Sequence, residues 1–193
     1  MQSIKTSTLL FALLLFVSCA GQSDMEQESD MTLSNDMNDT GEEITELVSV
    51  LHPTLGNDVN GVVRFFKVDE GIRVLAEVYD LDANSTHGFH IHQYGDCSEV
   101  DGTSAGGHFN PHGTRHGGPE SDERHVGDLG NIQVDQNGYA QYDRIDTVIS
   151  FEGANNIIGR GIIIHAGEDD LESQPTGAAG ARLACGVIGV ANQ

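Results

Sequence analysis

The chain has 193 residues, enough for one ordinary domain with a hydrophobic core. It carries 30 Asp and Glu against 9 Lys and Arg, a net charge of −21, which excludes nucleic acid and an anionic membrane surface as partners, since both require basic patches. Glycine is abundant, with 24 residues, and tryptophan is absent, a composition more typical of short strands and turns than of long helices.

Residues 1–18 predict an export signal, because Lys5 precedes an apolar run, residues 9–17, that is too short to span a bilayer. The sequence "FVSC" resembles the lipobox of bacterial lipoproteins, in which the cysteine, here Cys19, is lipidated after cleavage. Phe16 stands where that pattern usually has leucine. We therefore expect a protein anchored to a membrane only through lipid at Cys19, facing the periplasm or the cell exterior. An ordinary signal peptide with an incidental cysteine is the alternative.

Residues 19–46 predict a disordered tether between this anchor and the folded domain. Nine acids and no Lys or Arg occur between residues 20 and 46, and apolar residues are too few to bury a core. If Cys19 carries lipid, only Cys97 and Cys185 remain. In an exported protein such a pair suggests a disulfide.

From Leu47 onward the pattern predicts β-strands. In residues 72–79 apolar and polar side chains alternate, and "VDEG" (residues 68–71) predicts a turn before this run. Residues 131–143 predict a hairpin with its turn near Asn137-Gly138. Residues 156–165 predict a bulged strand containing two glycines.

No segment shows a sustained 3.6-residue period, so residues 47–193 are expected to form one all-β domain, an antiparallel barrel or sandwich. Two long glycine-rich connections interrupt it, residues 95–130 and 166–181. Connections of that length without internal structure are usually functional.

Nine histidines are present, and five of them lie between His90 and His116. His90 and His92 would point to the same side of a strand, where the pair can chelate a metal. Imidazoles with a carboxylate suit zinc or copper better than calcium or magnesium. The pair alone also occurs in cupins and in zinc hydrolases. However, Tyr94 stands where a metallo-β-lactamase pattern needs aspartate, and Asp96 and Cys97 where a cupin needs glutamate.

Six motifs taken together are more specific: "GFHIHQYGDC", "SAGGHFNP", "HGGP", "ERHVGDLG", "IIGRGIIIH" and "GARLACGVIG". In this order and spacing, over about residues 47–192, the chain resembles copper–zinc superoxide dismutases. The resemblance implies a Greek-key antiparallel β-barrel with two long functional loops and one copper and one zinc ion per subunit. It implies an enzyme that converts two superoxide anions to dioxygen and hydrogen peroxide, protecting against extracytoplasmic superoxide. A lipoprotein that buffers or delivers copper without turnover is the alternative from another class.

Carried over position by position, the resemblance implies a role for each matching residue. The copper ligands would be His90, His92, His108 and His165, and the zinc ligands His108, His116, His125 and Asp128. His108 would bridge both metals and carry a proton in catalysis. Asp169 would hydrogen-bond to His90 and His116, Arg182 would attract superoxide beside copper, and Cys97 and Cys185 would form the disulfide. No metal role is implied for His52, His87, His112 or Asp170.

The chain also departs from the family pattern in places. The stretch from His92 to Cys97 is shorter than in many eukaryotic relatives, where that loop contributes to a dimer contact, whereas Ile158-Gly159 and "GVIGV" match the same contact surface. The departure opposes a homodimer, but the matches leave a homodimer favoured. The connection from His165 to Arg182 is short and contains four acids but no lysine, where many relatives place charges that guide the substrate. A partner subunit, or Arg115 and Arg124 in the connection 95–130, would be another source of positive charge for that role.

Overall fold

The computed structural model describes residues 43–192, so the predicted export signal, Cys19 and most of the predicted tether lie outside the described residues. The strands are β1 (Glu46–Pro53), β2 (Asn60–Val68), β3 (Gly71–Tyr79), β4 (Thr86–His92), β5 (Asp128–Gln133), β6 (Ala140–Asp146), β7 (Gly161–His165), β8 (Arg182–Val187) and β9 (Gly189–Val190). Two 3-10 turns, η1 (Thr103–Ala105) and η2 (Gly153–Asn155), complete the elements. Within residues 43–192, no helix is long and apolar enough to cross a membrane.

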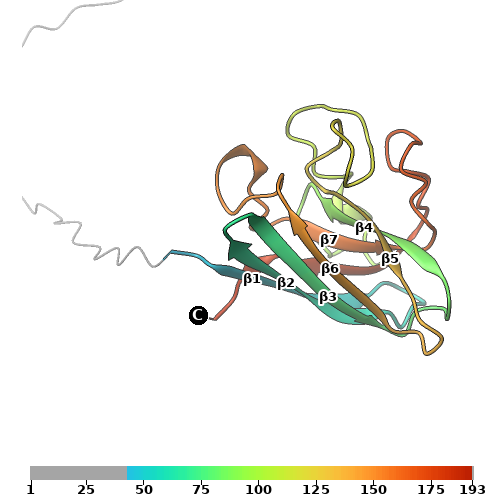
Figure 1. The fold of residues 1–193 in the computed structure, drawn as a ribbon. Helices are drawn as coiled ribbons and strands as arrows, with labels where there is room; N and C mark the ends of the chain where they lie inside the picture. The colour runs from blue at the N-terminus through green and yellow to red at the C-terminus, as the bar shows by residue number, and fades with distance from the viewer. Residues whose placement is uncertain (1–42, 193) are drawn as a thin grey trace, which may run out of the picture. The chain divides into compact units, whose positions relative to one another are not determined.

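The strands form one antiparallel sheet in the order β5-β4-β7-β8-β1-β2-β3-β6, with β9 paired to β1. Figure 1 shows how this sheet curls round, with two long loops at the end near β4 and β7. The edge strands β5 and β6 approach each other through a bridge between Val134 and Ala140 and a 2.9 Å hydrogen bond from the Tyr142 hydroxyl to the Leu129 carbonyl. This nearly closed barrel, whose neighbours β4–β7 and β1–β8 are far apart in sequence, confirms the expected Greek-key fold.

Two local expectations differ from the structure. The hairpin at Asn137-Gly138 is present but shorter than expected: a 2.8 Å bond from Asp135 N to the Tyr139 carbonyl and a bridge between Val134 and Ala140 close it, and beyond them β5 pairs with β4 and β6 with β3. The strand expected from residue 156 begins only at Gly161, after a left-handed Gly159 with φ of 76°. Alternation of side chains predicts that a strand exists but not which strand it pairs with.

The pair β4–β7 separates the hydrophobic core from the opposite face of the sheet. Phe89 pairs with Ile164, and Ile91 with Ile162, and all four side chains are fully buried in the core. Each such burial stabilises the fold by roughly 1.5–3 kcal/mol. Because successive side chains of a strand alternate, the intervening residues of β4 and β7 are held on the other face.

The disulfide between Cys97 and Cys185 is confirmed, and it closes a separation of 88 residues. In the chain-entropy account, a loop of this size stabilises the folded state by roughly 4–5 kcal/mol. It also attaches the start of the long loop 93–127 to β8, the strand that begins at Arg182.

Candidate metal centre

Three of the predicted copper ligands lie on the outer face of β4 and β7. His90 and His92 alternate with the core residues Phe89 and Ile91, and His165 ends β7. His108, from the long loop, joins them through a backbone bridge to His92. All four side chains are buried, and one potential ligand atom from each lies within 4.8 Å of those of the others.

Backbone hydrogen bonds draw the long loop onto β4. Phe109 N donates to the Ile91 carbonyl at 2.8 Å, Ile91 N donates to Gly127 at 2.9 Å, and Gly127 N donates back to Phe109 at 2.9 Å. A Cβ on Gly127 would lie 2.1 Å from the Ile91 carbonyl oxygen, so only glycine permits this approach. The loop is thereby placed so that His108 and Asp128 meet over the outer face of the sheet.

The predicted zinc ligands His108, His116, His125 and Asp128 form a second buried cluster that shares His108 with the first. One Asp128 oxygen lies 2.7 Å from His108 Nδ1 and 3.1 Å from His125 Nδ1, and the other lies 3.0 Å from His116 Nδ1. Three imidazoles and one carboxylate make the ligand set of a closed, tetrahedral zinc site.

Unpartnered nitrogens show that these residues fit metal ions. Among residues 43–192, His90 Nδ1 and His108 Nε2 are buried without a hydrogen-bond partner, one in the four-histidine cluster and one on the histidine that both clusters share. His92 Nε2 and His165 Nε2 face each other at 3.2 Å. A buried polar atom without a partner costs roughly 1–3 kcal/mol, and a cation bound within each cluster would provide that partner.

The pKa values also suit metal binding, which requires neutral imidazoles and an ionised carboxylate. Burial lowers the pKa of His108 to about 4 and that of His165 to about 3, and it holds the pKa of His92 well below its ordinary value. Burial alone would raise the pKa of Asp128, but hydrogen bonds from His108, His116 and His125 outweigh it and keep that pKa well below its ordinary value. His116 is the exception, because the hydrogen bonds to Asp128 and Asp169 outweigh burial and raise its pKa to about 9, so a metal ion bound by His116 must displace a proton.

Asp169 connects the two clusters, in the arrangement expected from the sequence. Its Oδ2 lies 2.7 Å from His90 Nε2 and its Oδ1 lies 2.9 Å from His116 Nε2. Gly177, at φ of 63°, makes room for this carboxylate, since a Cβ there would lie 1.8 Å from Asp169 Oδ1. The Asn131 amide exchanges two 2.8 Å hydrogen bonds with the Asp169 backbone. Nothing in the sequence pattern indicated this role for Asn131.

Arg182 lies beside the first cluster and is fixed by the long loop. Its guanidinium donates to the Gly102 carbonyl and, at 2.6 Å, to the Gly106 carbonyl, which also accepts a 2.9 Å bond from His92 Nδ1. Arg182 lines a cavity of about 420 Å³ together with Asp101. No sequence motif indicated Asp101, which places a negative charge in the cavity that contains the cationic side chain.

The remaining histidines lie outside both clusters. The ring of His87 bonds to the His165 carbonyl at 2.8 Å and to the Ser85 hydroxyl at 2.6 Å, which makes it a support for β7. His112 is exposed and contacts Asn155, and His52 is exposed at the end of β1.

The comparisons with known proteins agree with this geometry. Residues 59–188 match the model of the copper/zinc superoxide dismutase (SODC) family. A relative from Schizosaccharomyces pombe, superoxide dismutase [Cu-Zn], is 54% identical over 141 residues, covering 69% of this chain and 91% of the relative. Another of the same name, from Paramecium bursaria Chlorella virus 1, is 47% identical and covers 78% of this chain and 82% of its own length. The crystal structure of the clock protein EA4 superimposes with a TM-score of 0.69 at 39% identity, over 76% of this chain and 95% of that protein.

Proposed function

Because the chain belongs to the copper/zinc superoxide dismutase family, whose members convert two superoxide anions to dioxygen and hydrogen peroxide, we propose how its residues divide that work. The four-histidine cluster, beside Arg182, holds copper. The cluster containing Asp128 holds zinc. The assignment follows from the ligand types, since a carboxylate with three imidazoles favours a closed zinc site and an all-imidazole set suits a copper ion that changes oxidation state.

The observation that carries this proposal is the single histidine common to both clusters. Bound copper supplies a centre that accepts and returns one electron. His108 holds Asp128 through Nδ1, and its Nε2 is the atom at which it can take up a proton and release it to product. Arg182 supplies a positive charge and hydrogen-bond donors for a small anion.

Metal analysis and superoxide turnover measured on one purified sample test the proposed division. Protein loaded with both metals is expected to turn over superoxide, and protein loaded with zinc alone is expected to be inactive. Equal turnover in the two samples would contradict the copper assignment. No turnover in either sample would instead favour a protein that only buffers or delivers metal.

We also propose that two copies associate through one apolar face. Val50, Tyr94, Val187 and Val190 are each about half exposed, at 51%, 52%, 44% and 52%. A Cβ on Gly95 would lie 2.9 Å from a Val187 methyl group, so Val187 lies next to the residue that follows Tyr94.

Val187→Lys should convert a dimer to a monomer in sedimentation at micromolar concentration. A monomeric wild-type protein would contradict this proposal.

We further propose that the chain is exported and anchored through lipid at Cys19, where it protects against superoxide outside the cytoplasm. The apolar run at residues 9–17 and "FVSC" support this. The disulfide adds support, because it uses both other cysteines and disulfides persist in oxidising compartments.

Cys19→Ser is expected to leave the precursor unprocessed by lipoprotein peptidase or to release soluble enzyme, because no thiol remains to carry the lipid. Membrane fractionation and mass spectrometry of the N-terminal peptide measure this, and the wild-type peptide should carry a diacylglyceryl mass. Wild-type membrane association of the variant would show that another feature anchors the chain.

A further inference from the structure

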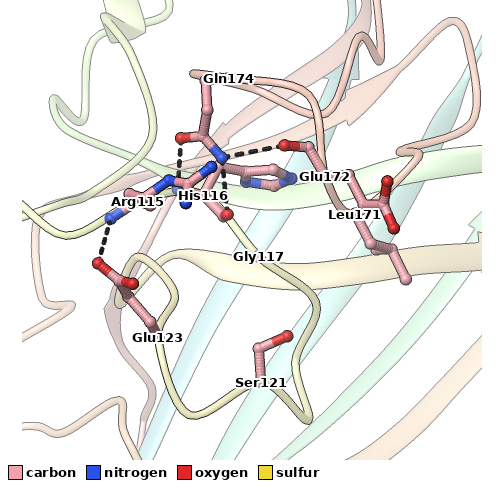
Figure 2. A pocket seen from close by; sticks show the side chains of 8 residues that line it. All are labelled: Arg115, His116, Gly117, Ser121, Glu123, Leu171, Glu172 and Gln174. Carbon is pink, nitrogen blue, oxygen red and sulfur yellow. Dashed lines mark hydrogen bonds between the residues drawn. The ribbon is translucent and has the colours of Figure 1, made fainter.

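Gln174 holds the main chain of His116 from the connection 166–181. Its side-chain oxygen accepts a 2.8 Å hydrogen bond from His116 N, and its side-chain nitrogen donates a 2.9 Å bond to the His116 carbonyl. Figure 2 shows this amide lying against His116 at one wall of a pocket of about 400 Å³. The two residues are 58 positions apart, so the contact joins the two long loops of the protein.

The Gln174 amide is positioned by its own turn. The Asp170 carboxylate accepts hydrogen bonds from Glu172 N at 3.0 Å and from Ser173 N at 2.7 Å, and Asp170 N donates to the Gly177 carbonyl at 2.9 Å. The Gln174 nitrogen also donates to the Glu172 carbonyl at 3.0 Å. Because the turn is closed by its own hydrogen bonds, Gln174 meets His116 already oriented, with little side-chain freedom left to lose.

His116 needs such support more than the other members of its cluster. His125 is three residues from Asp128, and His108 is bridged to β4, whereas His116 lies in the middle of the loop between them. Its ring contacts Asp128 and Asp169, and its peptide groups are held by Gln174. The ring of His116 is thus held by Asp128 and Asp169, and its backbone by Gln174.

We infer that Gln174 is a positioning residue that fixes His116 for zinc and slows the release of that metal, an inference that rests on the proposed zinc cluster. It acts on one metal because His116 is the only metal-cluster residue to which its amide bonds, whereas Asp169 bonds to a histidine of each cluster. Partners that orient metal ligands typically change metal affinity by roughly 10–100-fold. Gln174 is exposed, so we expect an effect at the lower end.

Gln174→Met removes both hydrogen bonds to His116, together with the bond to the Glu172 carbonyl, and keeps a side chain of nearly the same length. In the full-length, metal-loaded protein, zinc loss to a chelating dye is expected to be about tenfold faster, while the rate of copper loss changes less than about twofold. Cobalt(II) placed in the zinc cluster should show altered visible bands, because His116 is less well oriented. Ser121→Ala, at another wall of the same pocket, is the matched control and should leave both readouts unchanged.

The outcomes separate this inference from the proposal on which it rests. If the wild-type protein binds zinc but Asp128→Ala binds it equally well, the zinc cluster itself is wrongly assigned. If Asp128→Ala loses zinc while Gln174→Met matches wild type in zinc release and in the cobalt spectrum, Gln174 has no positioning role. Equal acceleration of zinc and copper loss would also overturn the inference, since it would indicate general loosening of the loops.

Discussion

His165→Ala is expected to lower copper content and superoxide turnover by more than the roughly 10–100-fold that loss of an outer partner costs, because His165 belongs only to the copper cluster. Zinc should stay bound. The fold should persist, since the core-facing neighbours Ile162 and Ile164 are unchanged and the disulfide remains. Metal content by mass spectrometry and turnover on the same sample measure the effect.

Two further variants make this result specific. Asp128→Ala removes the carboxylate that contacts three imidazoles and accepts hydrogen bonds from Gly117 N and His125 N, so zinc should be lost and the long loop loosened while part of the copper remains. His112→Ala removes an exposed histidine of the same loop and should retain both metals. If the His165 and Asp128 variants lost the same metal in the same proportion, the division into two sites would be wrong.

Arg182→Ala is expected to slow superoxide turnover about tenfold or more, because the variant loses the local positive charge and charged donors beside copper. Residues 47–193, which exclude Lys5 and the nine acids of residues 20–46, carry 21 acids and 8 bases. Their net charge of −13 repels the superoxide anion. Screening acts over about 10 Å at 0.1 M salt, so added salt weakens distant repulsion more than short-range attraction. The wild-type rate should therefore be nearly flat or rise slightly with ionic strength, and the rise should be clearer in the variant.

Asp101→Asn is the matched variant, because it removes a negative charge where Arg182→Ala removes a positive one. Asp101 lines the same cavity as Arg182, so removing its charge should raise the rate at low salt and reduce the dependence on salt. A steep fall in the wild-type rate between low and moderate salt would mean that a positive surface guides the anion. Arg115 would then be a candidate, but Arg124 would not, since it is buried in an ion pair with Asp146 at 2.5 Å.

How much the sequence predicted depends on how far apart the interacting residues are. His90 and His92 could be placed together on one face because strand geometry has a period of two, and the six motifs identified the fold and the partners of that pair. The hairpin expected at Asn137-Gly138 is present but short, because β5 and β6 find their other partners in β4 and β3. Such choices are decided by packing across the barrel, which alternation along one strand does not contain.

The supporting residues were missed for a related reason. Asn131, Gln174 and Asp101 act through backbone groups or through a shared cavity, and their partners lie on segments distant in the chain. An amide or a carboxylate in a polar loop resembles any other solvated side chain in a single sequence. Only the three-dimensional arrangement assigns them a partner.

The outer face of β4 and β7 has a consequence for how the protein opens. The loops covering it, residues 93–127 and 166–181, bury few apolar side chains: Ala105, Phe109, Val126 and Ala179. Apart from the Cys97–Cys185 disulfide and their hydrogen bonds, the loops are therefore held by the histidine and aspartate clusters, where coordination replaces hydrophobic burial, whereas the barrel interior is held by its own aliphatic core. Amide hydrogen exchange should consequently report two cooperative units, with the loops exchanging much faster after chelation and the strands remaining protected. The supply of metal would then determine how long the two loops stay closed over the outer face of β4 and β7, independently of the stability of the barrel.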